Sequence, residues 1–250
     1  MIMNIGIVGV GHIGKILALK LAKAGHEVAV ANSRGPEHID AHALATGAKA
    51  VTVEQVIQEK DVIILSIPLN RIPQIAPLLE KISDEVTIID TSNYYPGRDS
   101  GIDSIDEGQA ESLWVKEQIG RPFAKAWNAI GSQSFSSEGK PAGSENRIAV
   151  PIASDRDTDR KVTEQLVDET GFDAFYTGSL AESWRQQPGA PVYCTDLTMQ
   201  EMQEVIDTAE RERLPKRRDL AVAAVTERVG DTTTNPAGDY GVRLCRALFM

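Results

Sequence analysis

Apolar residues follow two alternating patterns along most of the chain. Residues 3–8 are apolar on both faces and predict a short buried strand of a parallel sheet. Residues 14–24 then place apolar side chains at helical spacing, with lysines toward water. Gly25 follows the last periodic position, where a helix end favours a left-handed conformation. Residues 27–31 predict a second strand, so the chain opens with a strand–helix–strand unit.

The alternation continues beyond this unit. Further strands are expected at 48–51, 62–67, 86–90, 122–126, 147–153 and 172–176. Helices are expected at 36–46, 53–59, 71–81, 109–119, 155–171, 179–186, 198–212 and 218–229. Long loops are expected at 91–108, 131–146 and 187–197. This order predicts an α/β fold, a doubly wound and mainly parallel Rossmann sheet with a small, mostly helical C-terminal part.

The change of pattern after Thr177-Gly178 predicts a division of the chain. Residues 1–177 are expected to form one Rossmann domain, and residues 178–250 a separate helical region. An apolar stripe within 218–229 could pack on a partner chain or on the chain's own core, and both interpretations stay open.

Composition excludes several classes of function. The chain has 26 basic and 36 acidic residues and a net charge of −10, which argues against nucleic acid or an acidic membrane as partner. We find no signal peptide and no apolar run long enough to span a bilayer, and therefore expect a cytoplasmic protein. Cys194 and Cys245 lack the spacing of a metal site or a redox pair.

A glycine motif lies between the first strand and the first helix. Residues 9–14 read G-x-G-x-x-G, the pattern of a dinucleotide-binding loop. Gly9 permits the tight turn, Gly11 lets the backbone approach a pyrophosphate, and Gly14 lets the helix pack close to the sheet. The free N–H groups of the helix start, from His12 and Ile13 onward, favour phosphate. A glycine-rich turn without a ligand is the alternative interpretation.

The end of the second strand indicates which dinucleotide is bound. An NAD site usually has a carboxylate there, which accepts hydrogen bonds from the ribose 2′-hydroxyl. This chain has Asn32, Ser33 and Arg34 instead. Ser33 can donate to a 2′-phosphate, and the guanidinium of Arg34 can pair with it. The sequence therefore favours NADP(H) over NAD(H) as the cofactor. Residues 1–177 are thus expected to be an NADP-binding Rossmann domain, and residues 178–250 a helical region for substrate binding or dimerisation.

Other strand ends should line the same crevice, because ligands of open α/β sheets lie beyond the carboxyl ends of the strands. Ser66, Ile67 and Pro68 are expected to pass under the cofactor ribose. Asn93 and Asn128 are candidates for contact with the nicotinamide carboxamide or the substrate, since an amide both donates and accepts. The alternative is that the two asparagines only cap helices.

Catalytic residues are less clearly indicated. His12 and Tyr94 are the candidates for a proton donor, and Tyr94 could equally anchor its loop. His38 and His42 have a spacing that permits metal binding, but no carboxylate or cysteine motif supports it, so no metal is expected.

Several segments together resemble a known family. Residues 9–14, 21–28, 32–34 and 66–68 are similar to those of the NADPH-dependent F420 oxidoreductases, whose wider relatives include pyrroline-5-carboxylate reductase and the reductase domain of the STEAP metalloreductases. The similarity is good to about residue 93 and extends more weakly to about residue 177. The resemblance implies a Rossmann domain, a small C-terminal part that completes the substrate cleft, and a homodimer. It also implies hydride transfer between NADP(H) and a planar acceptor, F420 or flavin-like.

Three functions follow from this reading. The first is an NADPH-dependent reductase of a planar acceptor, with an aromatic shelf from Trp127, Tyr94 or Tyr95. The second is a reductase of a small carbonyl or imine, which needs a proton donor such as Tyr94, Tyr95, Lys125 or His12. The third is a non-enzymatic NADP-binding sensor.

Overall fold

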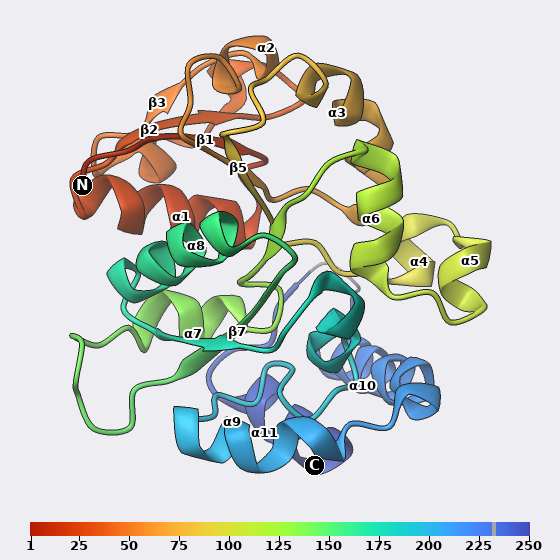
Figure 1. Ribbon diagram of the computed structural model, residues 1–250. Coiled ribbons are helices and arrows are strands. Elements are labelled where there is room, and N and C mark those ends of the chain that lie inside the picture. The colour runs from red at the N-terminus through yellow and green to blue at the C-terminus, as the bar shows by residue number, and fades with distance from the viewer. Residues whose placement is uncertain (232–233) are drawn as a thin grey trace.

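The computed structural model describes residues 1–231 and 234–250, and within them eight strands form one sheet (Figure 1). The strand order is β3-β2-β1-β4-β5-β6-β7-β8. All neighbours are parallel except β6 and β7, which are antiparallel. The strands are β1 (Asn4–Val8), β2 (Glu27–Ala31), β3 (Lys49–Ala50), β4 (Val62–Leu65), β5 (Thr87–Asp90), β6 (Ala124–Lys125), β7 (Ala149–Ser154) and β8 (Asp173–Tyr176). The first six follow the order of a Rossmann sheet, which confirms the predicted fold class.

Helices cover both faces of this sheet. The α-helices are α1 (His12–Lys23), α2 (Val53–Val56), α3 (Ile72–Leu79), α4 (Pro96–Asp99), α5 (Asp103–Asp106), α6 (Glu111–Ile119), α7 (Ser132–Ser137), α8 (Asp157–Glu169), α9 (Met199–Val205), α10 (Leu214–Val229) and α11 (Tyr240–Phe249). Short 3-10 helices are η1 (Pro36–His38), η2 (Ala41–Leu44), η3 (Leu69–Arg71), η4 (Leu180–Gln186), η5 (Ile206–Thr208) and η6 (Arg211–Arg213). Figure 1 shows α9, α10 and α11 gathered at the end of the molecule away from α2 and α3.

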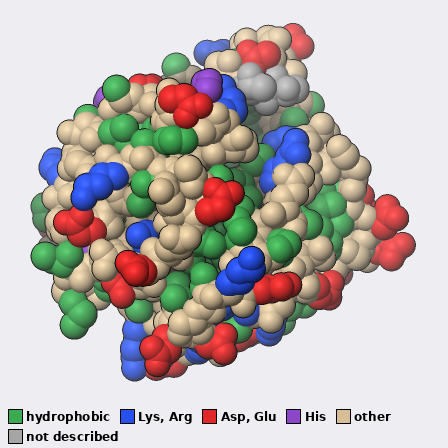
Figure 2. Space-filling view, turned by 90° about the horizontal axis from the view of Figure 1, so that it is seen from above, with side chains coloured by type: hydrophobic (Ala, Val, Ile, Leu, Met, Phe, Trp, Pro, Cys, Tyr) green, Lys and Arg blue, Asp and Glu red, His purple; other side chains and the backbone are tan. Residues whose placement is uncertain are grey.

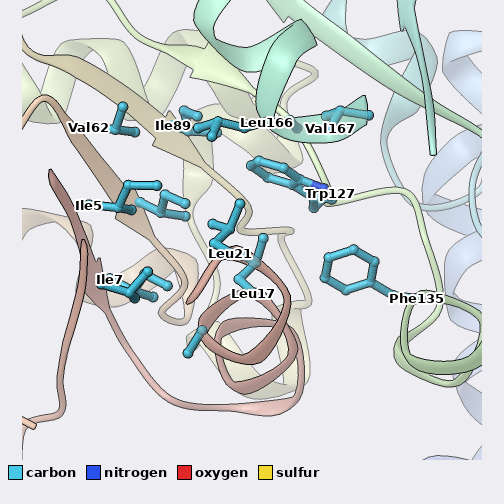
Figure 3. Packing of buried hydrophobic residues seen from close by; sticks show 14 of the residues in the cluster. Ile5, Ile7, Leu17, Leu21, Val62, Ile89, Trp127, Phe135, Leu166 and Val167 are labelled. Carbon is cyan, nitrogen blue, oxygen red and sulfur yellow. The ribbon is translucent and has the colours of Figure 1, made fainter. Parts of the chain in front are cut away.

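The period-two alternation of the strands separates two apolar cores. Ile5 and Ile7 of β1 point toward Leu17 and Leu21 of α1, and the same core takes in Trp127 (Figure 3). Successive residues of a strand face opposite sides, so Val8, Ile63 and Leu65 belong to the second core with helices α2, α3 and α6. Burial on both faces explains why these strands are apolar throughout.

The sequence-based helix boundaries are wrong in several places. Residues 36–46 form η1 and η2 rather than one α-helix, residues 179–186 form the 3-10 helix η4, and residues 198–212 divide into α9, η5 and η6. The expected loop 91–108 contains α4 and α5, and the expected loop 131–146 contains α7. Helix α10 begins at Leu214 rather than at 218, and α11 was not expected. Each of these segments is short or packs against distant parts of the chain, where local periodicity carries little information.

One face of the molecule carries side chains of both charges. Figure 2 shows acidic, basic and apolar side chains interspersed over the face seen from above, with no large patch of one charge. Among the helices of residues 1–231 and 234–250, none is long and apolar enough to cross a membrane.

Candidate cofactor site

Gly9 makes the turn that leaves β1. Its φ is +102°, and a Cβ atom at this position would lie 2.2 Å from the carbonyl oxygen of Ser66. Its N–H donates to the carbonyl of Ala31 at the end of β2, over 2.8 Å. Only glycine fits here, because a side chain would require both a rare backbone conformation and a shift of β4. The turn therefore holds the ends of β1, β2 and β4 together.

Gly11 and Gly14 have opposite surroundings. A Cβ atom on Gly14 would lie 2.1 Å from the carbonyl oxygen of Gly9 and 3.2 Å from the Cβ atom of Ser66. A Cβ atom on Gly11 would meet nothing within 4 Å. Gly14 thus brings α1 against the turn, while the space beside Gly11 stays open. This is the arrangement that a dinucleotide requires, since the backbone must approach the pyrophosphate closely.

The start of α1 presents unsatisfied donors. Gly11 is its N-cap and supplies no side-chain hydrogen bond, and the first turn contains no acidic residue. Gly11 and His12 are exposed and Ile13 is half-buried. The first N–H groups of a helix lack intrahelical partners and carry the positive end of its dipole. The residues present therefore fit the diphosphate of a dinucleotide.

The segment after β2 contributes a positively charged side chain to the site. Asn32 accepts a hydrogen bond from the main-chain N–H of Arg34 over 2.9 Å, which turns the chain. Ser33 and Arg34 are exposed, and within residues 1–231 and 234–250 the guanidinium of Arg34 has no hydrogen bond or ion pair. Its five donors are thus available to a ligand.

The end of β4 lies beside this loop. Ser66 donates its N–H to Val8 over 2.8 Å and accepts from the hydroxyl of Thr91 over 3.2 Å. Ile67 packs against the second core, and Pro68 is exposed at the start of η3. This segment forms one wall beside Gly9 and Gly14.

Asn93 and Asn128 are hydrogen-bonded to one another. The amide of Asn128 donates to the side-chain oxygen of Asn93 over 3.0 Å, and the amide of Asn93 donates to the carbonyl of Asn128 over 2.8 Å. Asn128 also donates to the carbonyl of Gln186, whose own amide donates back to Asn128, each over 2.9 Å. Asn93 in addition donates to the hydroxyl of Tyr193 over 3.2 Å. This network joins the ends of β5 and β6 to the C-terminal part.

The aromatic candidates are placed differently from the expected shelf. Trp127 is fully buried and packs on Phe135 in the first core, so its predicted position over the nicotinamide is wrong (Figure 3). Tyr94 is also fully buried; its hydroxyl donates to Asp106 over 2.9 Å and accepts from the N–H of Ile102 over 2.9 Å. This geometry favours the loop-anchor interpretation of Tyr94 over a proton donor.

Lys125 is engaged in a buried ion pair. Its ammonium lies 2.6 Å from Asp90, and the two side chains are 1% and 0% exposed. Asp90 also accepts from the N–H and the hydroxyl of Ser92, each over 3.0 Å. A proton-donor role for Lys125 is therefore disfavoured, because its ammonium is buried against Asp90.

The hydroxyls of Tyr95 and Tyr193 lie 2.6 Å apart. Burial raises the pKa of Tyr95 above its usual value, and it raises the pKa of Tyr193 as well. Tyr193 and Gln186, which complete this side of the site, were not among the residues singled out from sequence. Both lie more than 50 positions from the strand ends that they contact, and no local motif marks them.

No group of three histidine, cysteine or acidic side chains suited to a metal occurs in the described part of the chain. His26, away from the site, accepts from the N–H of Met3 and pairs with Glu169.

Comparison with known proteins places the chain in a family. The family model "NADP oxidoreductase coenzyme F420-dependent" matches residues 4–94, which span β1 to the segment after β5. "Putative protein YjhV" from Escherichia coli (strain K12) is 40% identical over 99 residues, which are 38% of this chain and 69% of that protein. The chain belongs to the F420-dependent NADP oxidoreductase family. The residues that carried the resemblance, from Gly9 to Pro68, lie within the matched segment.

Solved structures extend the likeness beyond the family match. Hypothetical protein SMa0349 from Sinorhizobium meliloti is 26% identical, with a TM-score of 0.66 over 79% of this chain and 96% of that chain. A "putative f420 dependent nadp-reductase" from Arthrobacter sp. FB24 is 17% identical, with a TM-score of 0.56 over 71% and 86% of the two chains. At that identity the second likeness concerns the fold alone. As a member of the F420-dependent NADP oxidoreductase family, the chain belongs to a group of oxidoreductases that use a nicotinamide cofactor.

Proposed function

We propose that this protein is an NADP(H)-dependent oxidoreductase that passes a hydride between NADPH and a planar F420- or flavin-like acceptor. The choice of NADP(H) rests on Arg34 at the end of β2, whose guanidinium has no partner among the described residues. Residues 32–34 also include no carboxylate. A carboxylate there would repel a 2′-phosphate, whereas an arginine binds it with two donors.

Each part of the site has a role in this proposal. The N–H groups at Gly11, His12 and Ile13 bind the diphosphate, beside the turn made by Gly9 and Gly14. Ser33 and Arg34 bind the 2′-phosphate, and Asn32 orients them through its hydrogen bond to Arg34.

The nicotinamide side is formed by the strand ends. Ser66, Ile67 and Pro68 support the ribose and the nicotinamide. Asn93 and Asn128 hold the opposite wall rigid through their shared hydrogen bonds. When bound, the cofactor supplies the hydride at its C4 carbon, and the protein's contribution is to orient the two rings and exclude water.

The planar acceptor is favoured because two of the candidate proton donors are already engaged within the protein. Tyr94 and Lys125 have their polar groups engaged within the protein. Hydride transfer between two flat rings depends mainly on proximity and orientation. His12 is exposed at the start of α1 and remains the candidate acid of this site.

A second function has one observation in its favour. The hydroxyls of Tyr95 and Tyr193 share a hydrogen bond of 2.6 Å, and such a pair could pass a proton to a small carbonyl or imine substrate. In this case Tyr95→Phe would abolish turnover, whereas reduction of a planar acceptor would survive it. A non-enzymatic NADP sensor is the third candidate and predicts no turnover at all.

We further propose that residues 1–177 bind the cofactor and residues 178–250 complete the acceptor side and pair two copies of the chain. Helix α10 supports this because Leu220 and Val222 are 48% and 39% exposed. Leu220→Glu should then shift the sedimentation coefficient from that of a dimer to that of a monomer. An unchanged coefficient would contradict pairing through α10.

The test of the activity is a direct one. The purified chain is mixed with NADPH that carries deuterium at C4, and F420, FMN or a small ketone is added in separate reactions. With F420 we expect deuterium on the ring carbon of the reduced acceptor and oxidation of NADPH in step with it. With FMN, whose transferred hydrogen lies on nitrogen and exchanges with water, we expect FMN reduction in step with NADPH oxidation. Reduction of the ketone alone would support the second function, and no turnover with any acceptor would support the sensor.

A further inference from the structure

A small cavity with both polar and apolar lining lies outside the cofactor site, between the segment before α6 and the start of α10. Its volume is about 50 Å³, and its apolar wall includes Trp184 and Leu214. Its polar lining includes Glu111, Arg211, Arg218 and Gln187. None of residues 9–14, 32–34 or 66–68 contributes to it. The volume exceeds what a single water molecule needs, so the cavity can hold a small polar group.

Arg218 presents free donors in this cavity. The residue is 8% exposed, and its Nε–H donates to Asp219 over 2.8 Å. Its guanidinium lies 5.4 Å from the centre of the Tyr94 ring. The two terminal amino groups form no hydrogen bond with residues 1–231 or 234–250. A buried guanidinium with its planar fork unoccupied is suited to a planar oxyanion.

Glu111 faces the same cavity from the start of α6. It is 2% exposed, and its Oε2 atom has no hydrogen-bond partner in the described part of the chain. Burial raises its pKa to about 7, although Lys125 of β6 and Arg218 of α10 act to lower it. The main chain of Tyr94 and the side chain of Gln187 also face this carboxyl and act to lower its pKa. Near neutral pH the protonated form is therefore well populated and offers an O–H donor.

The charge of the lining favours an anion. Arg211 donates to the carbonyl of Gly108 over 2.8 Å and lies 5.7 Å from the centre of the Trp184 ring. Two arginines thus oppose one carboxyl group, and arginine stays charged at any accessible pH. A cation would meet two positive charges here, whereas an anion would meet the donors of both arginines.

We propose that this cavity binds the carboxylate of a small organic acid. The carboxylate accepts two parallel hydrogen bonds from the terminal amino groups of Arg218 and one from the protonated carboxyl of Glu111. Its short apolar chain lies against Trp184 and Leu214. No covalent step is involved, and the proposal is independent of the cofactor and of the acceptor.

Binding of this kind is coupled to a proton. Glu111 must be protonated when the ligand carboxylate binds, because two carboxylates at hydrogen-bond distance repel one another. Well above pH 7 the affinity should therefore fall by about tenfold for each pH unit, and proton uptake should approach one proton for each acid bound.

The experiment is a titration of the full-length chain with acetate and propionate at constant ionic strength. The indole N–H signal of Trp184, assigned with a Trp184→Phe variant, reports on the cavity. We expect a saturable shift for both acids, weaker at pH 8 than at pH 6. Chloride and phosphate serve as other anions. A shift of equal size and affinity with chloride or phosphate would overturn the assignment to a carboxylate.

Three variants separate the roles of the two side chains. Arg218→Gln should weaken acetate binding by at least about tenfold, since charge-assisted hydrogen bonds are lost. Arg243→Gln removes an exposed arginine of α11 and should leave it unchanged. Glu111→Gln keeps a neutral donor, so binding should persist and lose its dependence on pH. Equal binding in the Arg218 and Arg243 variants, or a wild-type affinity that does not change between pH 6 and pH 8, would contradict the proposal.

A folding defect in Arg218→Gln would not end the test. Arg218→Lys keeps the charge but removes the two-pronged geometry, and it should weaken acetate binding by about tenfold. Undiminished binding in a folded Arg218→Lys variant would overturn the role of the guanidinium.

Discussion

The carbonyl oxygen of Gly9 lies 2.1 Å from the point where a side chain of Gly14 would begin. These two residues therefore fix the distance between the turn after β1 and the first turn of α1. Gly11, between them, borders open space on its Cα side. The glycines of one motif thus have two separable jobs, one in packing and one in leaving room for a ligand.

The packing role predicts a loss of stability on Gly14→Ala. The added methyl group would meet a backbone atom, which cannot move without displacing β1 or α1, so the free energy of unfolding should fall by about 1–3 kcal/mol. Gly11→Ala should change it by less than about 0.5 kcal/mol, because nothing is displaced. Urea denaturation of the two variants without cofactor measures both values. Equal losses of unfolding free energy in the two variants would contradict a packing role that belongs to Gly14 and not to Gly11.

The ligand role of Gly11 predicts that Gly11→Ala weakens NADPH binding even though it leaves stability nearly unchanged. Its methyl group would occupy the space through which a pyrophosphate approaches the backbone, so the dissociation constant for NADPH should rise at least about tenfold. Fluorescence titration with NADPH measures it. Unchanged affinity would mean that the diphosphate does not lie beside Gly11.

The buried pair of Lys125 and Asp90 predicts strong coupling. Lys125→Met should lower the free energy of unfolding by about 3–5 kcal/mol, because it leaves Asp90 as an uncompensated buried charge. Adding Asp90→Asn should restore more than half of that loss. Lys116, which pairs with Asp155 at 2.7 Å near the surface, is the control, and Lys116→Met should cost less than about 1 kcal/mol. Similar losses at the two lysines in chemical denaturation would contradict the argument.

Glu111 predicts a specific pH dependence of stability. Its pKa is raised to about 7 in the folded chain from 4.5. The folded state therefore binds this proton more tightly than the unfolded state, and the resulting stability is present below pH 4.5 and lost as the pH rises to 7. Glu111→Gln removes this loss, so its stability relative to wild type should increase between pH 5 and pH 8, by an amount on the order of 3 kcal/mol. Denaturation at several pH values measures the difference. A constant difference would show that the carboxyl is not perturbed.

The elements that local sequence determines were predicted well. The span of β2, residues 27–31, agrees with the structure, and β1, β4 and β5 agree to within two residues, because their apolar runs end at glycine, proline or polar positions. Residues 36–46 were expected as one helix, but the segment forms two 3-10 turns, and Asp40 between them caps the second. Helix α11 was missed because its apolar face packs on Ala190 and Tyr193, far away in the sequence.

In the candidate site, too, the features set by local sequence were predicted and those set by distant contacts were missed. The glycine loop and residues 32–34 are each one continuous segment of chain, so the local arrangement of each follows from a short motif. Asn93 and Asn128 were predicted to face one crevice, and the structure brings them together. Their partners Gln186 and Tyr193 come from the C-terminal part, and only the tertiary fold shows that these amides are already engaged.

The central claim is that Arg34 binds the 2′-phosphate of NADPH, and the most direct test is the affinity of Arg34→Ala for NADPH and NADH. Lys81→Ala, which removes an exposed charge after the end of α3, is the control. We expect the dissociation constant of Arg34→Ala for NADPH to rise by about 10- to 100-fold, because a charge-assisted pair is lost. The constant for NADH should stay close to that of the control. An equal rise for NADH and NADPH would contradict the assignment of Arg34 to the 2′-phosphate.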